Sequence, residues 1–365
     1  MVLLLNIILF VLGVFFVSKS SKHYMEGIES FHKKYFYVFL ALHFGIALFH
    51  WHWSFENGID VIDFHKRAVL SESWVELFGI GSTFIRFIIY PFVKLGVSYS
   101  TLFFLFSVLS YYGFLNYFKL LKPYIVNQKQ KALYLLFLLP SFHFWSAPIS
   151  KDSLVFFLMS VILIELKNRN YLLLSLSFIV IGFVRPHVVV VLLLAFILAL
   201  FFEKNINKKH IVIAVLGFVF GSLCLLSFIK LPGYSLEAIY LKLEQYNKYG
   251  LKHNSHIDIF KTSYLERIFA LLFRPMFLGA KRVFQYLVSI ENIVVLLTLG
   301  YILFKAKFKK ISLEVKYTLF TSLFLSLLIG VYIYNLGLAS RMRLMIYPYL
   351  IYGLIISLKP NNYER

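Results

Sequence analysis

The chain has 365 residues, of which 60% are hydrophobic and 15% are charged, and its mean hydropathy is +0.78. A soluble domain carries about 25% charged residues, so the composition excludes a soluble protein and predicts one integral membrane domain over residues 1–365. The net charge of +20 comes largely from lysines in short loops between apolar runs, which indicates membrane orientation rather than a nucleic-acid partner.

Apolar runs of near-spanning length follow one another along the whole chain. A spanning helix needs about 20 residues, so the pattern predicts an all-α, polytopic transmembrane bundle. The first run lacks the basic region and cleavage site of a signal peptide and is expected to be a retained helix. The predicted spans, about eleven in all, are residues 2–17, 35–53, 98–117, 132–147, 153–166, 171–184, 187–202, 211–229, 287–304, 315–334 and 343–358.

Basic residues gather in every second loop, and the positive-inside rule places these loops and the C-terminus in the cytoplasm and the N-terminus outside. The opposite, outward-facing set contains a first outer loop at 54–97 and a longer segment at 230–286. Within them, residues 83–96 are apolar, short and interrupted by Pro91, which predicts a re-entrant or interfacial helix. Residues 234–249 predict an amphipathic helix on the outer surface.

The first outer loop holds the candidate catalytic residues Asp60, Asp63 and His65, in the segment ENGIDVIDFHKRA. If this segment is helical, residues 60 and 63 share a face. A carboxylate there could deprotonate an attacking sugar hydroxyl. The two aspartates could also hold a divalent cation that touches a diphosphate, although no cofactor is required by the pattern. The alternative is an acidic loop that is simply solvated.

Lys151 and Asp152 lie side by side at the start of the predicted 153–166 helix. Asp152 is interpreted as a helix cap or as an ion-pair partner of Lys151, and Ser150 is an alternative cap. Lys151 is a candidate phosphate ligand. Because 14-residue helices cover only about 21 Å of a core about 30 Å thick, this turn and the next outer turn are expected to lie in a sunken cavity.

Further cations on the outer side oppose the positive-inside trend. An arginine can bind a phosphate through two parallel hydrogen bonds, and a histidine can donate to the same group. Arginines that snorkel to the interface are the alternative. With Lys151, the predicted phosphate or diphosphate ligands are Arg185, His187, Arg274, Arg341 and Arg343, and Arg86 and Lys94 could contribute.

Several segments, in order, resemble bacterial membrane proteins of surface-polysaccharide assembly, similar to O-antigen polymerases of the Wzy type and more distantly to GT-C glycosyltransferases. The resemblance covers residues 55–355 and is carried by DVIDFHKRA, LPSFHFWSAPISKDSLVFF, GFVRPHVVVVLLLAF, LLFRPMFLGAKRVFQYLVSIEN and NLGLASRMRLMIYPYL. It implies polyprenyl-linked sugar donors on the outer face, an acidic base at Asp60 or Asp63, and diphosphate-holding arginines. The very large outer loop of many such polymerases is missing, which leaves the exact reaction open.

We therefore expect a membrane glycosyltransferase or polysaccharide polymerase in the bacterial cytoplasmic membrane. Its expected partners are a polyprenyl-(di)phosphate-linked saccharide, the lipid bilayer and other polysaccharide-assembly proteins. A transporter or flippase for a lipid-linked saccharide would use the same cations, but it would be expected to show internal repeats and two-sided access, neither of which the sequence suggests. A non-catalytic scaffold of a glycan-assembly complex is the third interpretation.

Overall fold

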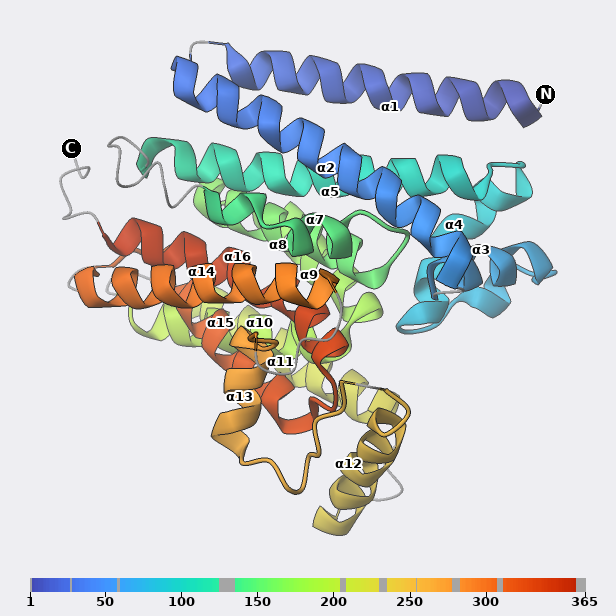
Figure 1. Ribbon diagram of the computed structural model, residues 1–365. Helices are drawn as coiled ribbons and strands as arrows, with labels where there is room; N and C mark the ends of the chain where they lie inside the picture. Colours follow the sequence, from blue (N-terminus) through green and yellow to red (C-terminus); the bar gives the residue numbers. More distant parts are fainter. Residues whose placement is uncertain are drawn as a thin grey trace. The chain divides into compact units, whose positions relative to one another are not determined.

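The computed structural model describes residues 2–26, 28–57, 60–124, 135–203, 208–229, 235–253, 255–277, 283–306 and 311–358 (Figure 1). Within these ranges the chain is all-helical, with fifteen α-helices and no strand beyond an isolated bridge between His256 and Asn335. The predicted all-α class is thereby confirmed. By internal contacts the chain divides into two compact units, residues 1–123 with 137–185 and residues 124–136 with 186–365.

The first unit is built around α5, which packs against α1, α2 and α8. Helices α3 and α4 form a short pair, and α4 also contacts α9. The helices of this unit are α1 (Val2–Met25), α2 (Ser30–Asn57), α3 (Asp60–Leu70), α4 (Ser82–Lys94), α5 (Tyr99–Leu121), α7 (Pro140–Ser146), α8 (Lys151–Asn168) and α9 (Tyr171–Val184), with a 3₁₀ turn at Val75–Leu77.

The second unit packs α15 against α16 and α10, and α13 lies against α14, α15 and α16. Its helices are α10 (Pro186–Phe201), α11 (Lys208–Ile229), α12 (Leu236–Gly250), α13 (Tyr264–Phe273), α14 (Val283–Lys305), α15 (Leu313–Tyr332) and α16 (Leu336–Ser357). Two further 3₁₀ turns, Lys122–Tyr124 and Leu135–Leu138, lie where the chain passes from one unit to the other.

Five helices of the described chain are long and apolar enough to cross a membrane: Val2–Met25, Ser30–Glu56, Tyr99–Tyr124, Val283–Lys305 and Leu313–Tyr332. Shorter apolar helices occupy Tyr171–Val184, Pro186–Phe201 and Ile211–Leu223. The chain is thus a multi-pass helical membrane protein, but the predicted eleven spans are not confirmed.

The predicted spans at 132–147 and 153–166 both differ from the structure. Among the described residues of the first there is a 3₁₀ turn and the seven-residue helix α7, separated by Leu139 before Pro140. Proline lacks a backbone donor and suits a helix start, which ends the continuous run there. Helix α8 instead has 18 residues and covers about 27 Å. The argument for a sunken turn from a short helix therefore fails for α8, whereas α9 has the expected 14 residues.

Hydroxyl and amide side chains start several helices, as the unpaired amides of a first turn require. Ser98 accepts from the Thr101 amide at the start of α5, and Ser150 accepts from the Ser153 amide at the start of α8. Ser150, not Asp152, is therefore the cap of α8. Helix α4 is short, as predicted for 83–96, but it continues through Pro91 rather than breaking there.

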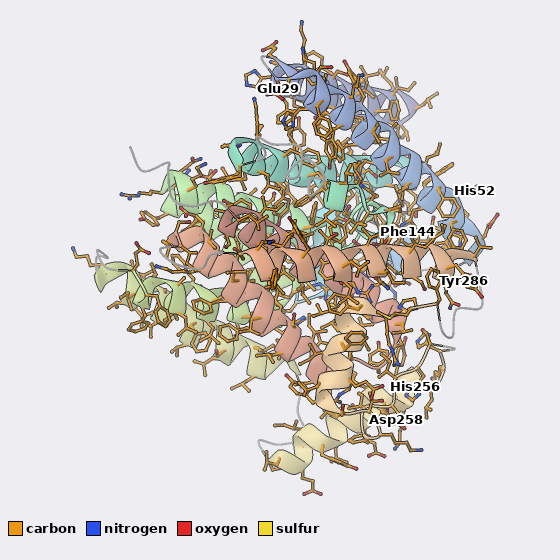
Figure 2. All side chains as sticks on the ribbon, turned by 60° about the vertical axis from the view of Figure 1, so that its left-hand side comes forward. Glu29, His52, Phe144, His256, Asp258 and Tyr286 are labelled. Carbon is orange, nitrogen blue, oxygen red and sulfur yellow. The ribbon has the colours of Figure 1, made fainter. Side chains whose placement is uncertain are left out.

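The predicted surface helix at 234–249 is α12, and the loop that follows it is tied to the start of α16. Ile257 donates its amide to the Tyr334 carbonyl at 2.7 Å, and Leu336 donates to the Ser255 carbonyl at 3.0 Å. His256 and Asp258, labelled in Figure 2, lie on this loop. The Asn247 side-chain oxygen accepts from the Ile259 amide at 2.9 Å, which fixes the loop to α12.

Candidate functional site

Helix α3 carries the predicted catalytic segment, and its sequence explains how it is held. Val61, Phe64 and Ala68 are buried at helical spacing, which gives α3 one apolar face and leaves its charged residues on the other. Helix α4 supplies the opposing surface with Ile85 and Ile89, both buried. The pair, which we call the α3–α4 platform, therefore presents polar side chains on a short, amphipathic surface.

Asp63 is the centre of the charges on this platform. One of its carboxylate oxygens accepts from Arg67 Nε at 2.8 Å, and the other accepts from Arg86 Nη2 at 3.2 Å. The Arg86 guanidinium also lies over the Phe64 ring, 5.9 Å from its centroid. Lys94 is exposed and donates to the Val69 carbonyl at 3.0 Å. Asp63 thus holds two arginines in place, and the platform carries two further exposed cations, Lys66 and Lys94.

His65 lies two residues after Asp63 on α3 and faces the start of α5. Its Nε2 is 3.5 Å from the Val97 carbonyl, and its ring centroid is 5.9 Å from that of Tyr99. Because a carbonyl can only accept, this contact places the proton on Nε2 and leaves Nδ1 as an acceptor. Burial lowers the pKa of His65 below its ordinary value of 6.5 against the opposing effect of the carbonyl. The imidazole is therefore neutral at pH 7 and can accept a proton.

The predicted divalent-cation site has little support among the residues that the structure describes. The side chain of Asp60 lies outside the described part of the structure, and both oxygens of Asp63 are taken up by arginines. Across the described residues, no group of three or more His, Cys, Asp or Glu side chains is arranged to hold a metal ion. Guanidinium groups compete with a cation for the same carboxylate, so the side chains present fit an anion better than a metal.

Asp152 and Arg185 form a buried ion pair between α8 and the end of α9. Their side chains are 1% and 5% exposed, respectively. Burying two charges costs several kcal/mol per ion unless they pair well, so these two residues compensate each other although they are 33 positions apart in sequence. Lys151 is half-buried as the first residue of α8. The Asp152 carboxylate is therefore engaged by Arg185.

Arg343 is also buried, 3% exposed, and it closes the C-terminus of α13 in the second unit. It donates to the carbonyls of Leu271, Ala270 and Arg274, and at 2.6 Å to the Asn292 side-chain oxygen. A cation at a helix C-terminus satisfies carbonyls that lack an intrahelical donor and is stabilised by the helix dipole. The Arg343 guanidinium is therefore held by carbonyl and amide oxygens of the protein itself.

The other predicted phosphate ligands of the second unit occupy separate settings. Arg274 is exposed and lies 3.5 Å from Glu266, and its peptide bond to Pro275 is cis. Arg341 is half-buried on α16. His187 is half-buried at the start of α10, with its ring 6.2 Å from that of Tyr332. Arg185 belongs to the first unit and these residues to the second, so each is placed only within its own unit.

A buried histidine pair in the first unit has no counterpart in the sequence predictions. The Nδ1 atoms of His43 on α2 and His143 on α7 are 3.1 Å apart. His43 Nε2 lies 2.9 Å from the Ser107 carbonyl on α5. The pair links three helices through polar contacts inside an aromatic cluster. Its members are 100 positions apart, and no local motif marks them.

The chain matches no protein-family model, no curated protein and no solved structure in comparisons with known proteins.

Proposed function

We propose that the protein is a membrane glycosyltransferase or polysaccharide polymerase that moves a glycan from a polyprenyl (di)phosphate carrier to a sugar hydroxyl. The observation that carries the proposal is the α3–α4 platform. It carries a neutral imidazole, His65, two arginines held by Asp63, Arg67 and Arg86, and the exposed Lys94. The same short helix pair thus carries a base and several cations, the kinds of group that transfer from an anionic leaving group requires.

In the proposed reaction, the acceptor hydroxyl oxygen attacks the anomeric carbon while the bond from that carbon to the phosphate oxygen breaks. The proton of the hydroxyl passes to His65 Nδ1. The negative charge that develops on the departing phosphate is stabilised by Arg67, Arg86 and Lys94. Asp63 is a positioning residue in this scheme, because its two oxygens hold the arginines that would contact the phosphate.

Two of the predicted phosphate ligands have a different role in this proposal. Arg185 and Arg343 are almost fully buried, at 5% and 3% exposure, against carboxylate and carbonyl groups of the protein, so we assign them to the support of the helices they contact. Lys151 in the first unit remains a candidate phosphate ligand, as do His187, Arg274 and Arg341 within the second unit. We also propose the bacterial cytoplasmic membrane as the location, with the α3–α4 platform on the outer face.

The test is transfer by the purified full chain in lipid nanodiscs, with a lipid-linked oligosaccharide as donor and new glycosidic bonds as the readout. Replacing His65→Gln is expected to lower kcat by about 100-fold or more, the usual contribution of a general base. His23→Gln is the matched control, since His23 is an exposed histidine near the end of α1. Movement of the saccharide across the bilayer without new bonds would instead support a flippase.

A further inference from the structure

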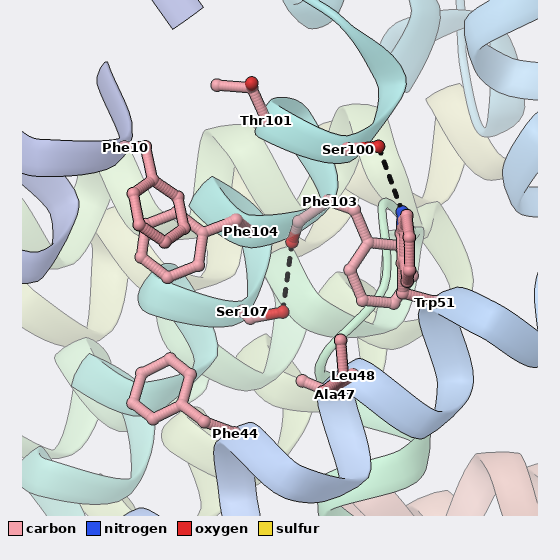
Figure 3. Close-up of a pocket in the computed structure, with 10 residues that line it drawn as sticks. All are labelled: Phe10, Phe44, Ala47, Leu48, Trp51, Ser100, Thr101, Phe103, Phe104 and Ser107. Carbon is pink, nitrogen blue, oxygen red and sulfur yellow. Dashed lines mark hydrogen bonds between the residues drawn. The ribbon is translucent and has the colours of Figure 1, made fainter. Parts of the chain in front are cut away.

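An apolar cavity of about 400 Å³ opens among three of the membrane spans in the first unit (Figure 3). Its walls are Phe10 of α1, Phe44, Ala47, Leu48 and Trp51 of α2, and Ser100, Thr101, Phe103, Phe104 and Ser107 of α5. We call it the α1–α2–α5 groove. Its volume lies within the range of pockets that take a small organic ligand.

The groove is apolar along its length and carries hydroxyl groups near the start of α5. The rings of Phe10 and Phe104 pack with their centroids 4.4 Å apart, and Figure 3 shows them together on one wall. At the other end Trp51 donates its indole N–H to the Ser100 hydroxyl at 3.1 Å. The helices that line the groove are all long enough to cross a bilayer. A hydrocarbon chain that lies in the groove is therefore surrounded by aliphatic and aromatic groups.

The hydroxyl-bearing end of the groove adjoins the α3–α4 platform. Tyr99, next to Ser100 in the chain, lies with its ring 5.9 Å from that of His65 and bonds through its hydroxyl to Ser54 at 2.7 Å. The platform carries the cations Arg67, Arg86 and Lys94. The groove thus lies next to the helix pair that carries these cations, an arrangement that suits a single-chain lipid that ends in a phosphate.

We propose that the α1–α2–α5 groove binds the first isoprene units of the polyprenyl carrier and places its phosphate at the α3–α4 platform. The proposal rests on the proposed function. In this proposal a single unsaturated chain lies against the paired rings of Phe10 and Phe104 and against Ala47, which all line the groove. A chain that enters from the bilayer exchanges one apolar environment for another, so the groove contributes position more than affinity.

The test uses the full chain in nanodiscs and a photoreactive isoprenoid phosphate with its reactive group on the first isoprene unit. Cross-links are mapped by mass spectrometry. Labelling is expected on the α5 peptide that contains Phe103 and Phe104, and Ala47→Phe is expected to lower it by about tenfold. Ala41→Phe is the matched control, because Ala41 is exposed on the same helix whereas Ala47 is buried in the groove wall.

Three outcomes would overturn the proposal. The first is equal labelling of α5 in the Ala47→Phe and Ala41→Phe proteins, and the second is labelling confined to other helices. The third is full competition by an equal amount of a diacyl phosphatidic acid, because that result would indicate an ordinary lipid contact. A thermal-unfolding scan shows that each variant is folded, and Leu48→Trp fills the groove from its exposed edge as a second variant. Labelling needs no turnover, so lipid binding in the groove can be confirmed even where no glycosidic bond forms. Transfer activity can likewise be found even where the groove is not labelled.

Discussion

Among single residues, Asp152, Arg185 and Arg343 are buried charges that meet specific partners. Asp152 is 1% exposed and meets Arg185, while Arg343 is 3% exposed and meets helix-end carbonyls. Each cation lies where an isolated charge would be costly. An arginine in an apolar segment can therefore serve the structure rather than bind substrate. The two roles predict different effects of substitution on stability and on activity.

The Asp152–Arg185 pair provides the first prediction. Asp152→Ala leaves a buried guanidinium without its carboxylate and is expected to cost about 3–5 kcal/mol of stability. Unfolding in mild detergent, followed by circular dichroism, measures the loss. The double variant Asp152→Leu with Arg185→Met removes both charges and should recover most of it.

Transfer activity of that double variant separates the two roles of Arg185. A folded double variant with normal activity fits a structural pair. A folded but inactive one would mean that Arg185 contacts the substrate and is more than a support for its helix.

His65 gives a pH prediction. Burial lowers its pKa below 6.5, so the imidazole stays neutral at pH 7 and accepts a proton there. As pH falls through this lowered pKa, His65 becomes protonated and the transfer rate should fall, at a lower pH than for an ordinary histidine. The pH profile of kcat measures it. The residual rate of His65→Gln should lack this acid limb, and an unchanged limb in that variant would assign the titration to another group.

Where two helices pack closely, only small residues fit at the contact. Helices α5 and α8 pack tightly at Gly113, where an added Cβ would lie 2.8 Å from two Phe156 ring atoms and 3.3 Å from the Phe157 Cα. Helix α8 in turn positions Asp152 for its pairing with Arg185. A small residue on α5 thus supports the buried ion pair indirectly.

Gly113→Leu is therefore expected to destabilise the first unit by about 1–3 kcal/mol through overpacking. The melting temperature in detergent measures the effect. Gly45→Leu on α2 is the matched control, because an added Cβ there meets no atom within 4 Å. Equal melting temperatures for the two variants would contradict the tight α5–α8 contact.

The protein as a whole crosses the membrane several times, and the proposed orientation can be measured. In a Cys224→Ser background, Lys66→Cys on α3 should react with a membrane-impermeant maleimide added to intact cells. Lys167→Cys, near the end of α8, should react only after the membrane is opened. Both native lysines are exposed in the described structure. The reverse pattern would invert the orientation and move the α3–α4 platform to the cytoplasmic face.

The broad class and several local features could be predicted from the amino-acid sequence. An apolar composition with lysines gathered between long apolar runs favours a helical membrane protein, because a helix satisfies its backbone groups within its own segment in lipid. Short patterns sufficed for the helices at 83–96 and 234–249, since the length and periodicity of an apolar run are local properties. The single span predicted at 132–147 is wrong, because Pro140 divides a run whose apolar side chains continue on both sides of the break.

Which polar residues meet depends instead on how the helices pack. The Asp152 carboxylate bonds Arg185, 33 positions away in sequence, because helices α8 and α9 pack and place the two ends together. The His43–His143 contact and the α1–α2–α5 groove likewise join residues far apart in the chain. Packing between helices depends on the shapes of whole surfaces, and no short stretch of sequence carries that information.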